Sequence, residues 1–466
     1  MLYYFTGIKD RFRDVEGEMK RISTLLPLIT VCTLLTGCGL GGDKYTVMKA
    51  PTNQDDAGII AKCTTEAQAL SVAKKFGGKF RVLNKQKKLV EIYDIPAHVL
   101  KDELPHAKFK GNVVYQGLIS QDSSVKALEE PFNGPGAPVF RKEFQNDYFP
   151  YLDQVGATNP SPDANGEGVT VAVIDSGVAY NHPHLSPNIA VNTSEEIYNL
   201  SDDDGNGFVD DFNGWDFVEG DRNPWDDHGH GTHVAGLIAG TINGIAPKAK
   251  ILPIKVLSAS GSGDLGSILA GITYALQKNA DVINLSLGGP MAGMAYEDIQ
   301  TFLGQLNAGL NQDTLFVVAA GNGGSDGIGD CNDEQPLFPA SVLHENILTV
   351  ASVNDYNELT TYSNFGKVSV HIAAPGGSFE NGGLLSTAPK ACNTCSDESY
   401  QKMSGTSMAT PVVSGIVAAI KSYAPELSMV EIKNLIKESG VYSQELENKI
   451  ESSRVANLSM ALQAVN

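Results

Sequence analysis

The chain has 466 residues and a formal net charge of −20, with 42% hydrophobic and 19% charged residues. This composition allows a large core and excludes wholesale disorder, and the net negative charge argues against nucleic acid as the partner. The charge is uneven, because residues 62–110 carry 11 basic and 5 acidic side chains whereas residues 111–466 carry 16 and 42. A block of net charge +6 thus precedes one of −26. Two units of opposite charge can attract each other, or each can face a partner of its own.

The N-terminal residues have the pattern of an export signal. The basic tripeptide Met19-Lys20-Arg21 precedes an apolar stretch from Leu25 to Leu35, which is the order of a secretory signal peptide. The stretch ends in Leu35-Thr36-Gly37-Cys38, which resembles the signal of bacterial lipoproteins, in which the cysteine becomes the lipidated first residue. We expect residues 1–37 to be a signal peptide, with Met19 as a second candidate start and Cys38 as the lipidation site. An ordinary signal peptide is the alternative.

A lipidated cysteine would place the chain in the cell envelope. Gly39, rather than an aspartate, follows the cysteine, and by the same resemblance this favours the outer membrane in a Gram-negative cell. Residues 38–61 are then expected to be a tether, and the membrane is contacted through the lipid alone. Release outside the cell after processing is a further expectation.

Four cysteines remain once the leader is removed and Cys38 is lipidated. An exported chain folds in an oxidising compartment, where cysteines can form disulfides. Cys392 and Cys395 have the spacing of a redox or zinc motif, but no histidine or second cysteine pair lies near them in the sequence. A disulfide is therefore favoured over metal, and Cys63 and Cys331 leave the pairing open.

Residues 62–120 show the alternating helix and strand patterns of a small α+β unit. The predicted elements are helices at Ala67–Phe76 and Ala97–Leu104 and strands at Phe80–Leu83, Leu89–Tyr93 and Asn112–Ile119. Residues 121–147 are rich in Pro, Gly, Ser and Asp, and they are expected to be a linker.

From Gly168 the pattern changes to short apolar runs separated by stretches of helical periodicity. Such runs fit strands buried on both faces, and their alternation with helices indicates an α/β fold with a doubly wound, mostly parallel sheet in residues 148–466. The predicted strands are Val169–Ile174, Ile251–Leu257, Val282–Leu285, Leu315–Ala319, Ile347–Val350 and Val368–Ile372. The predicted helices are Thr232–Thr241, Gly263–Lys278, Tyr296–Leu310, Thr406–Tyr423 and Ser428–Glu438.

Three segments carry reactive side chains where such a fold gathers them, at the carboxyl ends of strands and the starts of helices. The first strand runs into Asp175, and a turn that contains His230 opens a helix. Ser407 follows a glycine turn at the start of another helix. A serine hydroxyl is a weak nucleophile until a base takes its proton, and a histidine is that base when a buried carboxylate orients it. Asp175, His230 and Ser407 can supply these three roles.

The order of these segments resembles the subtilisin-like serine proteases. The matching motifs are Ile174-Asp175-Ser176-Gly177-Val178, His230-Gly231-Thr232-His233-Val234-Ala235-Gly236, Ala319-Ala320-Gly321-Asn322 and Gly405-Thr406-Ser407-Met408-Ala409. The resemblance covers about residues 150–440 and implies a serine endopeptidase. It further implies that Asn322 donates its side-chain amide to the oxyanion, together with the backbone amide of Ser407.

Two rival functions fit parts of this pattern. A catalytically silent peptide-binding module would keep the fold, but the complete set of catalytic motifs speaks against it. A zinc peptidase would use the clustered histidines, but His230 and His233 are only three residues apart and the glutamate of the zinc motif is absent. We expect His230 to be the base, His233 to face the helix interior and His228 to lie in a loop near the site.

Two short segments resemble the strands that bind extended substrate in this family. Ser286-Leu287-Gly288 follows the strand at 282–285 and would flank the primary specificity pocket, and Gly261-Ser262-Gly263 would form the opposite strand. A peptide between them would add as a further strand through backbone hydrogen bonds. A simple turn is the alternative for the glycine-rich segment.

An acidic loop between the aspartate and histidine motifs has the spacing of a calcium-binding loop. It reads D-x-D-x-N-G-x-x-D from position 202, an arrangement of oxygen donors that suits a hard cation. The predicted ligands are Asp202, Asp204, Asn206, the Phe208 carbonyl and Asp210. The twelfth residue of the loop is Asn213, where a calcium-binding loop of this kind has a bidentate glutamate. We expect structural Ca²⁺ here, with a solvated acidic loop as the alternative.

By the same resemblance, residues 62–120 are expected to be an inhibitory prosegment. Their size, position and predicted elements suit that role, and their positive charge complements the acidic domain. A retained tether domain is the alternative. Cleavage within 120–150 would separate the lipid from the enzyme. The expected partners are protein or peptide substrates and this prosegment, with no nucleic acid, and the domain is expected to be a monomer.

Overall fold

The computed structural model describes residues 149–465, apart from 197, 325, 379–382 and 390–399, and five short strands that precede them. The upstream strands are β1 Val47–Lys49, β2 Ile59–Lys62, β3 Lys79–Asn84, β4 Leu89–Tyr93 and β5 Val114–Gly117. The first four form one antiparallel sheet in the order β1-β2-β4-β3. β3, β4 and β5 confirm the three strands predicted in this region.

Several predictions fall outside the described residues. These are the leader with Cys38, the helices at 67–76 and 97–104, and Cys63, Cys392 and Cys395. Cys331 is described, and it is a free and partly buried cysteine. Within the described part of the chain, no helix is both long enough and apolar enough to cross a membrane.

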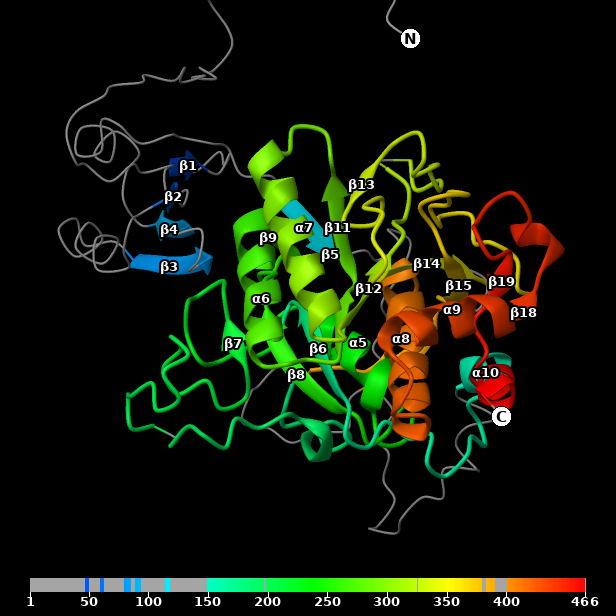
Figure 1. Ribbon diagram of the computed structural model, residues 1–466, viewed down its shortest axis with the longest axis horizontal. Coiled ribbons are helices and arrows are strands. Elements are labelled where there is room, and N and C mark those ends of the chain that lie inside the picture. The colour runs from blue at the N-terminus through cyan, green and yellow to red at the C-terminus, as the bar shows by residue number, and fades with distance from the viewer. Residues whose placement is uncertain are drawn as a thin grey trace, which may run out of the picture. The chain divides into compact units, whose positions relative to one another are not determined.

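A nine-stranded sheet forms the centre of the fold, in the order β18-β19-β15-β14-β12-β10-β6-β8-β7 (Figure 1). Neighbours from β19 to β7 are parallel, and β18 alone pairs antiparallel within this sheet. Its strands are β6 Thr170–Asp175, β7 Trp215–Asp216, β8 Lys250–Lys255, β10 Val282–Leu285, β12 Leu315–Ala319, β14 Ile347–Val353, β15 Ile372–Pro375, β18 Val441–Tyr442 and β19 Arg454–Val455. The predicted mostly parallel sheet is thereby confirmed.

Helices and smaller sheets surround this central sheet. The helices are α4 Pro150–Gln154, α5 His230–Ala239, α6 Leu265–Gln277, α7 Tyr296–Asn311, α8 Thr406–Tyr423, α9 Met429–Ser439 and α10 Leu458–Val465, with 3-10 turns η1 Ser186–Asn188 and η2 Gln444–Leu446. The remaining strands are β9 Ser262–Asp264, β11 Leu287–Pro290, β13 Leu337–Phe338, β16 Leu384–Thr387 and β17 Tyr400–Met403.

The central sheet is buried on both faces, as the apolar strand sequences predict. In β6, Val171 and Val173 pack in a cluster with the apolar side chains of α5 and α8. The alternate residues, Ala172 and Ile174, pack in a second cluster with those of α6 and α7. Because successive side chains of a strand point to opposite faces, helices cover the sheet on both sides.

The strand predicted at Val368–Ile372 is wrong for most of its length, because β15 begins only at Ile372. The backbone amides of Val368 and Ser369 donate to the carboxylate of Asp333 instead of joining a strand ladder. A side chain from a distant loop thus satisfies these amides, and the local apolar pattern gives no sign of it.

Candidate active site

A buried carboxylate and an imidazole meet at the carboxyl end of β6. Asp175 is the last residue of that strand, and His230 is the first residue of α5. Their Oδ1 and Nδ1 atoms are 2.7 Å apart, and both side chains are fully buried. The carboxylate therefore fixes the ring through Nδ1, and Nε2 of His230 is buried without a hydrogen-bond partner among the described residues.

The charge around His230 favours its protonated form. Burial by itself lowers the pKa of this imidazole, because the cation loses its hydration. The charge of Asp175, the hydrogen bond to it and the charge of Asp226 outweigh burial, and together they raise the pKa of His230 above its ordinary value. The ring is thus surrounded by groups that stabilise an imidazolium once it forms.

Ser407 lies in the first turn of α8, directly after a glycine-led turn. This helix packs against α5, which begins with His230. The Ser407 hydroxyl is fully buried and donates to the carbonyl of Ser286 at 2.9 Å. The structure therefore places Ser407 at the start of a helix that packs against α5, with its hydroxyl bonded to Ser286 and not to Nε2 of His230.

Asn322 presents an unused donor beside this serine. Its Oδ1 accepts hydrogen bonds from the backbone amide of Thr406 at 2.9 Å and from the Thr406 hydroxyl at 2.8 Å. Those two bonds determine which way the side-chain amide points. Its Nδ2 is buried and has no hydrogen-bond partner among the described residues. A buried, oriented donor without an acceptor is what a developing oxyanion requires.

An extended segment of the chain itself lies between the two predicted substrate-binding segments. β5 pairs antiparallel with β11, where Gly117 is opposite Leu287 and Gln116 is opposite Gly288. On its other side β5 pairs antiparallel with β9, where Gln116 is opposite Ser262. The edges of β9 and β11 therefore accept a strand between them by backbone hydrogen bonds alone.

Comparison with known proteins agrees with this geometry. The model of the subtilase family matches residues 166–455, which is more than half of the chain. The chain belongs to the subtilase family. Thermitase of Thermoactinomyces vulgaris is 34% identical over 57% of this chain and 80% of its own length. The major intracellular serine protease of Bacillus subtilis is 36% identical over 60% of this chain and 75% of its own length.

Two further comparisons extend the match. A thermophilic serine proteinase from a Bacillus species (strain AK1) is 30% identical over 77% of this chain and 79% of its own length. A cold-adapted subtilisin-like serine proteinase of known structure is 29% identical to this chain. The match covers 62% of this chain and 90% of that protein, with a TM-score of 0.47. The family match and the serine proteases among the sequence relatives show that this subtilase is a hydrolase of the serine protease class.

The two other histidines of the segment 228–233, His228 and His233, lie on either side of His230 in the sequence. His233 is fully buried, and its Nε2 lies 2.9 Å from the Leu384 carbonyl and 3.1 Å from that of Gln401. Burial lowers the pKa of His233 to about 3, so its ring is neutral. His228 is half-buried, with its ring 6.3 Å from that of His230. No histidine belongs to a metal-type cluster in the described part of the chain.

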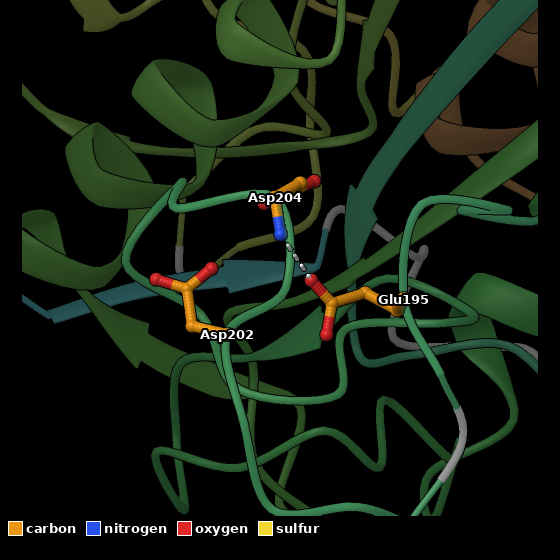
Figure 2. Close-up of side chains that lie close together, drawn as sticks. All are labelled: Glu195, Asp202 and Asp204. Atoms are coloured by element: carbon orange, nitrogen blue, oxygen red, sulfur yellow. Dashed lines mark hydrogen bonds between the residues drawn. The ribbon is translucent and has the colours of Figure 1, made fainter.

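The acidic loop of this subtilase holds three carboxylates together, one of which the motif did not predict. Glu195, Asp202 and Asp204 each place an oxygen within 4.8 Å of the others (Figure 2). Glu195 is buried, and its Oε1 accepts from the amides of Asp203 and Asp204. It lies outside the repeating spacing of the motif, so only the folded loop reveals it.

The remaining predicted ligands of the loop have other partners. Oδ2 of Asp210 is paired with Arg222, whereas its Oδ1 is buried without a hydrogen-bond partner among the described residues. The Asn206 side chain donates to Asp211 at 3.0 Å and accepts from the Phe208 amide at 2.7 Å. The loop therefore has a core of three carboxylates, with Asp210 and Asn206 at its edge.

Proposed function

We propose that this subtilase is a serine endopeptidase that uses Asp175, His230 and Ser407, with Asn322 as an oxyanion donor. The observation that carries this proposal is the buried 2.7 Å pair of Asp175 and His230, which leaves Nε2 of the ring unpartnered. The unpartnered Nδ2 of Asn322, held beside Thr406 and Ser407, supports the oxyanion role. The family match and the serine proteases named by the comparisons agree with it.

The reaction follows from these positions. Ser407 Oγ attacks the carbonyl carbon of the scissile bond while Nε2 of His230 takes the hydroxyl proton. The carbonyl oxygen becomes an oxyanion, which accepts from Nδ2 of Asn322 and from the backbone amide of Ser407. The intermediate collapses when His230 returns the proton to the leaving amine, and water then hydrolyses the acyl-enzyme by the same steps. Before attack, the Ser407 hydroxyl must turn away from the Ser286 carbonyl.

A fluorophosphonate probe tests this proposal, because it reacts only with an activated serine. The folded protein is expected to gain one adduct, and peptide mapping by mass spectrometry is expected to find it on Ser407. Absence of labelling on folded protein would instead favour the silent peptide-binding module, which keeps the fold without the chemistry.

Proteins and peptides in extended form are the proposed substrates. Support comes from β5, whose backbone pairs with both β9 and β11 as a substrate strand would. Gly261-Ser262-Gly263 and Ser286-Leu287-Gly288 would then bind an extended peptide between them through its backbone. Small residues at these edges allow close approach of another backbone.

Residues 62–120 are proposed to be an inhibitory prosegment. Two observations support this role: the place of β5 between β9 and β11, and the net charge of +6 in residues 62–110 against −26 in the residues that follow. A strand that already fills this place excludes substrate until the chain after β5 is cut and the segment leaves. Cys38 is proposed to carry the lipid, which anchors the uncut chain in the cell envelope.

Cleavage between β5 and the catalytic domain would release the enzyme from its anchor. Membrane and soluble fractions of cells that express the wild-type chain or Ser407→Ala are compared by blotting. The wild-type enzyme is expected as a shorter soluble form, whereas Ser407→Ala is expected to stay full length and bound to membrane. Both chains remaining full length in the membrane would contradict autocatalytic release.

The acidic loop is proposed to bind one structural Ca²⁺. Three clustered carboxylates and the unpartnered Oδ1 of Asp210 provide hard oxygen ligands. Glu195, Asp202 and Asp204 would hold the ion directly, with Asn206, Asp210 and the Phe208 carbonyl as further candidates. The ion would neutralise charge that Lys278, paired with Asp204 at 3.2 Å, leaves on the three carboxylates, and it would tie together parts of the loop.

Removal of calcium is expected to lower thermal stability. A ligand at a hundredfold excess over its Kd stabilises the folded state by about 3 kcal/mol, and chelation removes this amount. Melting temperature is measured by calorimetry with Ca²⁺ and with excess chelator, for the wild type, Glu195→Gln and the surface control Glu167→Gln. The shift should be lost in Glu195→Gln and kept in Glu167→Gln. An unchanged melting temperature of the wild type in chelator would refute the calcium site.

A further inference from the structure

The helix that begins with His230 has no side-chain cap of the usual kind. Its N-cap residue is Gly229, which has a φ of 103° and offers no side-chain acceptor. The first amides of a helix have no partner within the helix, so they need acceptors from elsewhere. The Gly231 amide donates to the hydroxyl of Ser176 at 3.0 Å, and the Thr232 amide donates to Oδ2 of Asp226 at 2.8 Å.

Asp226 accepts hydrogen bonds from both sides of this junction. The carboxylate is 1% exposed, and it forms no ion pair with any described residue. Its Oδ1 accepts from the Ser176 hydroxyl at 2.8 Å and from the amides of His228 and Gly229 at 3.0 and 2.8 Å. Its Oδ2 accepts from the amide and the hydroxyl of Thr232. A buried carboxylate at a helix N-terminus is also favoured by the helix dipole.

Ser176 connects this carboxylate to the strand that carries Asp175. Its amide donates to Oδ1 of Asp175 at 2.7 Å, the same oxygen that faces His230. Its hydroxyl donates to Asp226 and accepts from Gly231. The contact is tight, because a Cβ on Gly231 would lie 2.1 Å from the Gly177 carbonyl. The end of β6 and the start of α5 are thus joined through Ser176 and Asp226.

We propose that Asp226 is a positioning residue for His230, and that it acts through Ser176 and through its own negative charge. This inference rests on the proposed function, since it concerns the same imidazole. By capping α5 and holding Ser176, Asp226 keeps the His230 ring within hydrogen-bond distance of Asp175. Its charge adds to that of Asp175 when the ring becomes an imidazolium during acyl transfer.

Several titratable or charged groups face or lie near His230, and the effect of Asp226 on the pKa of His230 is judged against them. They are Asp175 at the end of β6, Asp226 in the turn before α5, His228 and His233 on either side in the chain, and Lys255 at the end of β8. His233 stays neutral, and Lys255 donates to the Ser176 and Leu257 carbonyls and to Asp227. Asp175 and Asp226 are therefore the two negative charges that raise the pKa of His230.

Two variants separate geometry from charge. Asp226→Asn removes the charge and two acceptor positions, so we expect kcat to fall about tenfold to hundredfold with KM nearly unchanged. The acid limb of the kcat/KM profile should move to lower pH, because the pKa of His230 falls. Ser176→Ala breaks the connection but keeps the charge. We therefore expect kcat to fall with the acid limb in place. Rates are normalised to active sites titrated with a fluorophosphonate.

A variant that loses the N-cap of another helix, α9, serves as the matched control. Ser428 caps α9 through a capping box, and Ser428→Ala should lower the melting temperature without moving kcat or the pH profile.

The pKa of His230 is also measured by NMR of ¹⁵N-histidine in a Ser407→Ala background, which does not depend on activity. Adding Asp226→Asn should lower that pKa. An unchanged His230 pKa together with unchanged normalised kcat would overturn the proposal. If Asp226→Asn does not fold, a wild-type kcat in Ser176→Ala would overturn it. Failure of the wild type to label would instead count against the proposed function.

Discussion

Substitution of Ser407 by alanine is expected to lower kcat for peptide hydrolysis by about a million-fold, the size of effect measured when the nucleophile of subtilisin itself is removed. The variant keeps the edges of β9 and β11, so peptide affinity should change little. Turnover of a chromogenic peptide is measured with purified wild type and variant at matched concentrations. The residual rate reflects only oxyanion stabilisation and binding.

Ser422→Ala is the control for this prediction. Ser422 lies in the same helix, near its opposite end, where its hydroxyl bonds to the carbonyls of Asp163 and Ala419. The control should keep wild-type kcat while it loses some stability, because it removes a hydroxyl far from the site. A Ser407→Ala protein that retained even a few per cent of wild-type turnover would show that another residue is the nucleophile.

Substitution of Asn322 by alanine is expected to lower kcat by about 10²–10³-fold, which corresponds to about 2.7–4 kcal/mol of transition-state stabilisation, and to leave KM nearly unchanged. That range also comes from subtilisin, a member of this family. The physical reason is the unpartnered Nδ2 of Asn322, which finds its acceptor only when the oxyanion forms. Steady-state kinetics on one peptide substrate give both parameters.

Asn322→Asp separates the two functions of this side chain. A carboxylate can still accept from Thr406, as Oδ1 of Asn322 does, but it cannot donate to an oxyanion. We expect this variant to fold like the wild type and to lose at least as much kcat as Asn322→Ala. Equal kcat in the wild type and both variants would remove Asn322 from the oxyanion site.

The sequence was most informative where chemistry and local pattern coincide. The apolar run that ends in Asp175 predicts a strand end. The glycine turn before Ser407 and the apolar stretch after it predict a helix start, and the structure has both. The helix at Thr406–Tyr423 was predicted with the same bounds as α8, because a glycine turn and a long apolar stretch mark it. The central sheet followed from strands that are apolar on both faces.

The features that escaped prediction depend on contacts between distant segments. Glu195 joins Asp202 and Asp204 through a fold of the loop that no residue spacing encodes. Asp226 lies four residues before His230, but its importance arises from its bond to Ser176, 50 residues earlier in the chain. The direction of the Ser407 hydroxyl, toward the Ser286 carbonyl, likewise depends on tertiary contacts.

Trapping the acyl-enzyme tests the central claim most directly, because a covalent bond to Ser407 is the step that the other residues serve. The enzyme is mixed with a p-nitrophenyl ester, quenched in acid within milliseconds, and mapped by mass spectrometry. We predict a burst of nitrophenol of about one equivalent per titrated site, with the acyl group on Ser407. Turnover of the ester with no burst and no adduct, or with the adduct on a different residue, would contradict the account.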